Sequence, residues 1–293
     1  MIVSAFNSCL PQYSMLALSA VIIFLAIYKI MLSCDKYRLQ HYYKIITIAC
    51  YFQLFWLLTQ IFSVECLMHL SDNPHQFKGT TGSALILSAM LLFSLIPIYK
   101  YKKWLIIPPI IAILASRQSG AIFALIGGLL FYVMFTTQKC RKTIICMVIF
   151  LALVAFKIDN PLINRANGRF DYWEVIAKDI VAEKTFTGYG LGIFKHLQYE
   201  HWNTNVYRAH NVYLQITREQ GLIGLFFMLL LPLSCFIDFL RHRTKEKLLW
   251  MTAIVMILLN MVGNFPDRNY TTMLLMLFIF ACYRVNRRDY VSI

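Results

Sequence analysis

Two arginines and a histidine in this sequence stand where such side chains do chemistry on phosphorylated substrates. Arg117 lies in a short polar break between two apolar runs, where an arginine is costly beside lipid unless it faces a cavity or an anion. Arg169 opens an amphipathic stretch, where its guanidinium and the free N–H groups of a helix start can share a phosphate. His210 precedes Asn211 at the start of a long apolar run, and an imidazole can remove a proton from a hydroxyl.

Each of these residues also has a plainer interpretation. Arg117 can extend its side chain to the membrane–water interface, and Arg169 can contact a lipid headgroup. His210 can be an ordinary surface histidine at the end of a helix. Arg165 and Arg208 in the same segment are further candidates for phosphate binding. The surrounding sequence therefore has to decide between the two interpretations.

The segment 157–211, about 55 residues long, contains most of these side chains. Connections of this length tend to be functional or disordered, and a helical pattern in it favours function. The pattern predicts a helix on the membrane surface or packed on a helix bundle. A turn with Gly188, Gly190 and Gly192 follows, and alternate glycines permit tight bends and close approach of a ligand to backbone N–H groups. The apolar residues at helical spacing are Phe170, Trp173, Ile176, Ala177, Ile180 and Val181.

The acidic residues of this region do not predict a metal site. Asp171 and Glu174 are three apart and share a helix face, but a solvated face explains them. No cluster of His or Cys has the spacing of zinc ligands. Glu219, followed by Gly221 and Gly224, is expected to cap and pack a helix rather than to react. We therefore expect neither a metal nor another cofactor.

The composition places these residues in a membrane protein. Of 293 residues, 59% are hydrophobic and 14% are charged, which is too apolar for a soluble globule of this length. A formal net charge of +14 would suggest nucleic-acid binding in a soluble protein, but here the Lys and Arg residues form short clusters between apolar runs. The eight cysteines include no CxxC pair, which indicates neither a zinc site nor a disulfide framework. We expect an integral membrane protein that binds no nucleic acid.

The apolar runs predict an all-α, polytopic transmembrane helix bundle of about nine spans, since a span needs roughly 20 apolar residues. Residues 1–293 then form a single membrane domain, and 157–211 is a partly helical loop on its outer side. The predicted spans are Tyr13–Leu32, Lys44–Val64, Ser83–Tyr99, Trp104–Ala115, Ala121–Phe135, Thr143–Phe156, Val212–Leu240, Leu248–Asn264 and Thr271–Val285.

Five basic clusters between the spans set the expected orientation, because Lys and Arg accumulate on the cytoplasmic side. Placing all five in the cytoplasm requires the stretch 104–135 to cross twice, with a break at 116–120. A single helix of that length would be roughly 48 Å long, against a hydrocarbon core of about 30 Å. Arg117, the loop 157–211 and the N-terminus then lie outside. The clusters are Lys36/Arg38/Lys44, Lys100/Lys102/Lys103, Lys139/Arg141/Lys142, Arg241/Arg243/Lys245/Lys247 and Arg284/Arg287/Arg288.

Several short motifs between Lys78 and the C-terminus form a recognisable set. They are Gly79-Thr80-Thr81-Gly82, Ser116-Arg117, Arg169 before a Trp-bearing helix, Gly188-Tyr189-Gly190-Leu191-Gly192, Ala209-His210-Asn211-Val212-Tyr213-Leu214-Gln215 and Glu219-Gln220-Gly221-Leu222-Ile223-Gly224. The set resembles the O-antigen ligase/polymerase family of bacterial membrane glycosyltransferases, most specifically from Gly188 to Gly224. Family members commonly have more spans, so we expect the chain to be shortened at its N-terminus.

The resemblance implies a reaction on the periplasmic side of the bacterial inner membrane. The donor is a glycan on undecaprenyl diphosphate, because no nucleotide sugar is available outside the cytoplasm. The acceptor is a glycan or lipid A–core. For this chain the resemblance implies that Arg117, Arg169, Arg165 and Arg208 hold the donor diphosphate, that His210 is catalytic and activates the acceptor hydroxyl, and that Gly188, Gly190, Gly192 and Asn211 shape the site.

These expectations describe a metal-independent, inverting glycosyltransferase resembling O-antigen ligase. A polymerase that joins lipid-linked repeat units is the alternative within the family, and nothing in these residues separates the two. A transporter or flippase for polyisoprenoid-linked glycans is the alternative of another class, since it also needs a basic cavity. Against the transporter, the hydropathy contains no inverted repeat, and the largest outer loop carries the richest polar chemistry.

Overall fold

The computed structural model describes residues 22–23, 25–62, 84–116, 118–136, 173–181, 185–192, 209–262 and 270–288. In these ranges the chain is helical and has no β-strand, which confirms the all-α prediction for that part of the chain. Short helical stretches also occur at 25–32 and 173–181. The main helices are α3 (Lys36–Phe62), α5 (Ala84–Tyr101), the 3₁₀ turn η3 (Lys103–Ile106), α6 (Ile107–Ala115), α7 (Ser119–Phe135), α11 (Val212–Arg241), α12 (Lys245–Asn260) and α13 (Tyr270–Arg288).

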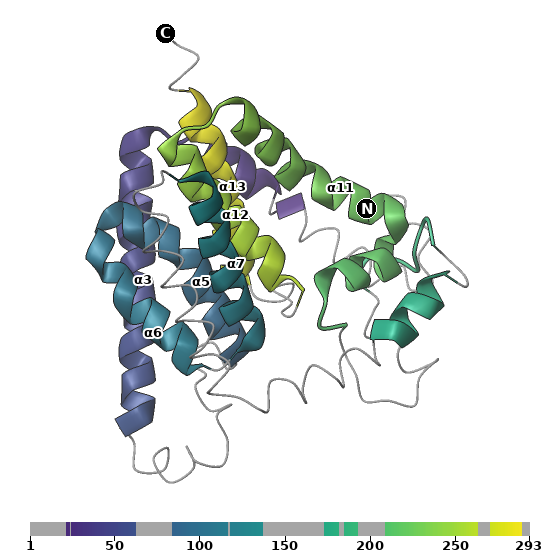
Figure 1. Ribbon diagram of the computed structural model, residues 1–293, viewed down its shortest axis with the longest axis horizontal. Coiled ribbons are helices and arrows are strands. Elements are labelled where there is room, and N and C mark those ends of the chain that lie inside the picture. The colour runs from purple at the N-terminus through teal and green to yellow at the C-terminus, as the bar shows by residue number, and fades with distance from the viewer. Residues whose placement is uncertain are drawn as a thin grey trace.

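The basic ends of several helices meet at one end of the bundle (Figure 1). The ammonium of Lys100, at the end of α5, lies 2.6 Å from a carboxylate oxygen of Glu246, at the start of α12. The guanidinium of Arg243, between α11 and α12, lies 5.4 Å from the ring centroid of Phe135, at the end of α7. We call this the basic end. Its composition is what an alternating topology with cytoplasmic basic connections predicts.

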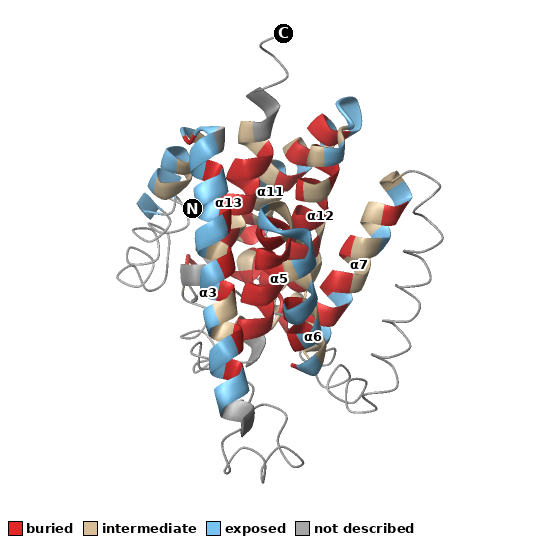
Figure 2. Cartoon of the chain, turned by 90° about the vertical axis from the view of Figure 1, so that its left-hand side faces the viewer, coloured by how far each residue is buried: buried red, intermediate tan, exposed pale blue. Residues whose placement is uncertain are grey.

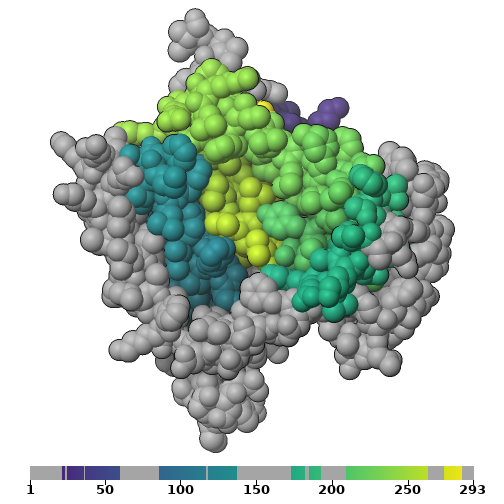
Figure 3. Space-filling view, turned by 45° about the vertical axis from the view of Figure 1, so that its right-hand side comes forward, coloured from purple at the N-terminus to yellow at the C-terminus, as the bar shows by residue number. Residues whose placement is uncertain are grey.

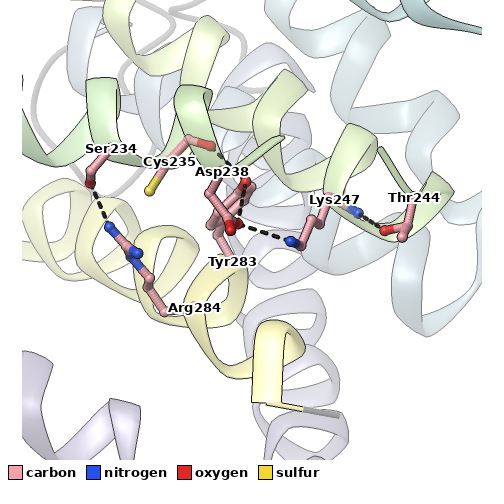
Figure 4. A network of polar contacts seen from close by, with 7 residues as sticks. All are labelled: Ser234, Cys235, Asp238, Thr244, Lys247, Tyr283 and Arg284. Carbon is pink, nitrogen blue, oxygen red and sulfur yellow. Dashed lines mark hydrogen bonds and ion pairs between the residues drawn. The ribbon is translucent and has the colours of Figure 1, made fainter. Parts of the chain in front are cut away.

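A buried polar network joins α11, α12 and α13 near the basic end (Figure 4). The Lys247 ammonium donates to the Asp238 carboxylate at 2.9 Å, and the two side chains are only 3% and 7% exposed. The Tyr283 hydroxyl lies 3.1 Å from the same carboxylate oxygen, and Arg284 donates to the Ser234 hydroxyl. Because buried charges are stable only when they are paired, this network ties the three helices together in one arrangement.

Figure 2 shows that α5 and much of α12 are buried, while α3 is exposed along one side, and the exposed faces of α3 and α11 carry large apolar side chains. On α3, Ile48, Phe52 and Phe55 are 59%, 57% and 63% exposed, and on α11 Phe226 and Phe227 are 59% and 62% exposed. Large apolar side chains along whole helix faces are unfavourable in water and suit contact with lipid. The surface thus agrees with a membrane protein.

One helix in the described part of the chain, α11, is long and apolar enough to cross a membrane by itself. Shorter apolar helices cover 86–101, 103–115, 119–135 and 274–285, where the sequence predicts further spans. Span Thr143–Phe156 and half of span Tyr13–Leu32 lie outside the described residues. The number of about nine spans therefore stays a prediction.

The helices contain two breaks, one expected and one not. α6 ends at Ala115 and α7 begins at Ser119, which confirms the predicted interruption at 116–120. Inside α11, Gly221 has φ 67° and ψ −173°, which splits the helix into a short part, 212–220, and a long part, 222–241. The long part alone reaches about 30 Å at 1.5 Å per residue, enough to cross the hydrocarbon core. The short part is thereby free to belong to the loop.

Candidate functional site

His210 lies at the start of α11, in a backbone conformation that few residues adopt. Its φ is +50°, in the left-handed region that is uncommon for residues other than glycine. The next residue, Asn211, is the N-cap of α11, because its side-chain oxygen accepts hydrogen bonds from the N–H groups of Tyr213 (3.0 Å) and Leu214 (3.2 Å). The cap fixes the backbone on one side of His210 and so limits the directions that its imidazole can take.

The start of α11 is fastened to the end of α12. The Val212 N–H donates to the Met261 carbonyl at 2.9 Å, and the Tyr213 hydroxyl donates to the Leu258 carbonyl at 2.7 Å. Because α12 begins at the basic end, His210 belongs to the opposite end of the bundle. The break between α6 and α7 is at that opposite end too, since α7 finishes at the basic end.

The helix 173–181 packs against the short part of α11, which confirms the amphipathic pattern in these residues. The indole N–H of Trp173 donates to the Ala209 carbonyl at 2.8 Å, directly before His210. Ile176 and Ile180 are buried against Ala209. Val181, which the pattern also placed on the packed face, is 74% exposed, so in this respect the prediction is wrong.

The opposite face of this helix is solvated, as the sequence predicts for Glu174. The Lys178 ammonium lies 2.7 Å from a Glu174 carboxylate oxygen, and the side chains are 75% and 65% exposed. The hydrogen bond from Lys178, helped by its positive charge, lowers the pKa of the Glu174 carboxyl. A pair so exposed contributes little to stability.

A second ion pair on the same helix is buried. The Arg218 guanidinium of α11 lies 2.9 Å from an Asp179 carboxylate oxygen, with side-chain exposures of 0% and 20%. The Tyr189 ring centroid is 5.8 Å from the guanidinium carbon, close enough for a cation–π contact. Arg218 therefore touches both the helix 173–181 and the glycine turn.

The glycine turn, residues 185–192, lies on α11 at the break. Gly188, Gly190 and Gly192 have φ of 67°, 130° and 75°, so all three use the freedom that the sequence predicts for them. The Gly190 N–H donates to the Glu219 carbonyl at 2.8 Å, and the Gly192 N–H donates to the Glu219 carboxylate at 2.8 Å. These N–H groups thus approach the backbone and a side chain of α11. Glu219 fastens the glycine turn to α11, which is a packing role and not the helix cap that the sequence predicts.

The start of this turn, at Thr185 and Phe186, packs against α11 at the break at Gly221. The Leu222 N–H donates to the Thr185 carbonyl at 2.8 Å, a bond outside the helical pattern. A Cβ atom on Gly221 would overlap the carbonyl group of Phe186, and one on Gly188 would overlap the backbone of Glu219. Glycine is therefore required at both positions, by close backbone contact as well as by positive φ.

The result is a unit in which two segments, the helix 173–181 and the glycine turn, lie on the short part of α11 (Figure 3). It contains five of the predicted site residues, with the three glycines at the Gly221 end of the short part and the other two at its start: Gly188, Gly190, Gly192, His210 and Asn211. The four arginines predicted to bind the diphosphate, Arg117, Arg165, Arg169 and Arg208, lie outside the described residues, and their roles stay predictions.

Sequence reasoning missed Arg218 and its partner Asp179. A signal was available, because Arg218 lies inside the predicted span Val212–Leu240, and a charge inside a span needs a partner. Among the residues that the structure describes, no group of three His, Cys, Asp or Glu side chains has the geometry to hold a metal ion. The arrangement offers a histidine at a helix start, where partial positive charge favours an anion nearby.

Comparison with known proteins gives one family. Residues 104–229 match the family model described as O-antigen ligase. This range begins before the break at 116–120 and ends after the break at Gly221, so it includes the whole unit around His210. Neither the curated proteins nor the solved structures contain a match to the chain.

Proposed function

Because residues 104–229 match the O-antigen ligase family model, we propose that the chain is a glycosyltransferase of this family, which transfers a glycan from a lipid diphosphate to an acceptor hydroxyl. The family is membrane-associated and of the ligase or polymerase type. We propose undecaprenyl diphosphate as the carrier, lipid A–core as the acceptor, and the periplasmic face of the inner membrane as the place of reaction.

The observation that supports this most is the structured unit around His210. The family match spans it, and a histidine held beside a capped helix start is suited to act on a hydroxyl. The long part of α11 leads directly from this unit along an apolar surface, where a lipid-linked donor would be located.

In the proposed mechanism, an imidazole nitrogen of His210 takes the proton of the acceptor hydroxyl. The acceptor oxygen attacks the anomeric carbon from the face opposite the diphosphate. The bond between that carbon and the diphosphate oxygen breaks, and its electron pair leaves with the lipid diphosphate. Arg117 and Arg169 hold the leaving group through paired hydrogen bonds, with Arg165 and Arg208 beside them. A single displacement of this kind inverts the anomeric centre.

The assignment is tested by separating donor binding from turnover. Replacing His210 by Ala should lower single-turnover transfer about 10²–10⁴-fold and leave donor binding nearly intact. Replacing Arg117 or Arg169 by Lys keeps the charge but loses the planar fork, so donor affinity should fall. The measurements are donor affinity and single-turnover transfer in nanodiscs. A His210→Ala protein with near-normal turnover, or with donor binding as poor as that of the arginine variants, would refute the assignment.

Two further measurements define the reaction. Lipopolysaccharide gels of a deletion strain distinguish the two family activities, because lost capping of the core indicates a ligase and single-repeat capping indicates a polymerase. EDTA should leave transfer by the purified protein unchanged, since the mechanism uses arginine in place of a metal. Transfer that EDTA abolishes and Mg²⁺ or Mn²⁺ restores would contradict that part of the proposal.

A further inference from the structure

We propose that the helix 173–181 is a strut that holds the donor side of the site against His210, and that Asp179 and Arg218 are positioning residues of the reaction. This inference rests on the proposed function, because it concerns how the two halves of that site are brought together. It assigns a role to a buried ion pair that the mechanism itself does not use.

The strut is attached at two points, to Ala209 just before α11 and to Arg218 within α11. At the first residue that the structure describes in this helix, the Trp173 indole donates to the carbonyl of Ala209, the neighbour of His210. Two turns later, Asp179 meets Arg218 at 2.9 Å. Ile176 lies between these attachments and is fully buried. Two polar contacts with an apolar contact between them fix both the position and the rotation of a short helix.

The ion pair is the attachment most sensitive to change. The Arg218 side chain is 0% exposed, so water cannot take over the role of its carboxylate partner. Arg218 also presents its guanidinium to the Tyr189 ring, and its carbonyl accepts the Tyr189 N–H at 2.9 Å. A change in the ion pair should therefore alter the positions of both the strut and the glycine turn.

The strut matters for donor binding because of what precedes it in the chain. Arg169, assigned to the diphosphate, is four residues before Trp173. Four residues span at most about 14 Å, so the Cα atom of Arg169 lies within that distance of the Cα atom of Trp173, whose indole is attached to Ala209. Releasing the strut would separate the donor-binding arginine from the histidine that activates the acceptor.

The same helix provides a matched control. Lys178 and Glu174 form an ion pair on its exposed face, at 2.7 Å and with exposures of 75% and 65%. Glu174→Gln removes one carboxylate charge from this helix, as Asp179→Asn does, but from the solvated side. A difference between these two variants therefore reports on the buried attachment and not on the charge of the helix.

The experiment compares Asp179→Asn, Asp179→Glu and Glu174→Gln in nanodiscs, by hydrogen exchange and by steady-state transfer. In Asp179→Asn we expect amides of 173–181 to exchange at least tenfold faster, with exchange in α12 unchanged as the internal reference. We expect the KM for the lipid-linked donor to rise about tenfold or more, with a smaller fall in kcat. Asp179→Glu, which keeps the charge, should recover most of both losses, and Glu174→Gln should resemble the unaltered protein.

A second variant distinguishes loss of the attachment from general misfolding of the protein. Trp173→Phe removes the indole N–H of the other attachment and keeps an aromatic ring there, and it should also raise the donor KM while α12 stays protected. Unchanged exchange in 173–181 for Asp179→Asn, or faster exchange with normal kinetics, would overturn the inference. An unaltered protein that transfers no glycan would contradict the proposed function instead, and the exchange result alone would then decide whether the pair holds the helix.

Discussion

Replacing Gly221 by Ala should detach the glycine turn from α11. The native conformation at this position, φ 67° and ψ −173°, is essentially restricted to glycine and costs another residue about 1–3 kcal/mol. The new methyl group would also overlap the Phe186 carbonyl, so the turn must move and the 2.8 Å bond from Leu222 to Thr185 is lost, at about 0.5–1.5 kcal/mol.

The same substitution also stabilises the alternative state, in which the glycine turn is detached and α11 is a straight helix. With Ala at position 221, α11 can continue as a regular helix, which favours the straight form by about 1 kcal/mol. Together these contributions disfavour the docked turn by about 3–5 kcal/mol, which is more than a hundredfold in its equilibrium constant. Gly127→Ala in α7 is the control, because there the added methyl meets only the flexible end of the Leu259 side chain.

The assay is hydrogen exchange of residues 185–192 together with glycan transfer, both in nanodiscs. For Gly221→Ala we expect loss of amide protection in that segment and a large loss of transfer, while Gly127→Ala keeps both. Full protection of the turn in the Gly221→Ala protein would refute the reasoning about the break. Loss of protection with normal transfer would show that the docked turn is not needed for the site.

Three further predictions follow from the described contacts. A reporter fused at Phe170 should face outward and one fused in the connection 242–244 should face the cytoplasm; the opposite result for Phe170 would remove the basis of the proposed mechanism. Lys247→Met leaves the Asp238 carboxylate buried without its ion-pair partner, which should lower stability by about 3–5 kcal/mol, visible as a reduced thermal midpoint; an unchanged midpoint would contradict the role of the network. Asn211→Ala removes the cap of α11, at about 1 kcal/mol, and should lower transfer without abolishing it, because the residue after His210 loses its anchor.

The positions of the helices were predictable from the sequence where one continuous run of residues determines them. Apolar runs located α3, α5, α7, α12 and α13, and the polar residues at 116–120 located the break between α6 and α7. Helical spacing predicted the packed face of 173–181 as well. In each case the signal lies within about twenty consecutive residues, because it arises from local periodicity or from the thickness of a membrane.

The contacts that organise the site were not predictable in the same way. Asp179 and Arg218 are far apart in sequence; the place of Arg218 inside a predicted span indicates that it needs a partner, but no local pattern identifies Asp179 as that partner. The break at Gly221 depends on the carbonyl of Phe186, which a helical pattern does not reveal. The sequence predicted that the three glycines form a turn. It did not reveal whether the N–H groups of that turn contact a ligand or the helix α11, because both arrangements are compatible with the same glycine pattern. Such features depend on tertiary contacts, which a single sequence does not contain.

The buried pair of Asp238 and Lys247 has a consequence for biosynthesis. The two residues are nine apart, at the end of α11 and the start of α12, so their ion pair forms within one helical hairpin. Each charge alone would oppose entry of its helix into the bilayer, whereas the neutralised pair reduces that cost. We therefore expect the translocation machinery to release α11 and α12 into the lipid as one unit, before α13 arrives with the Tyr283 hydroxyl to complete the network.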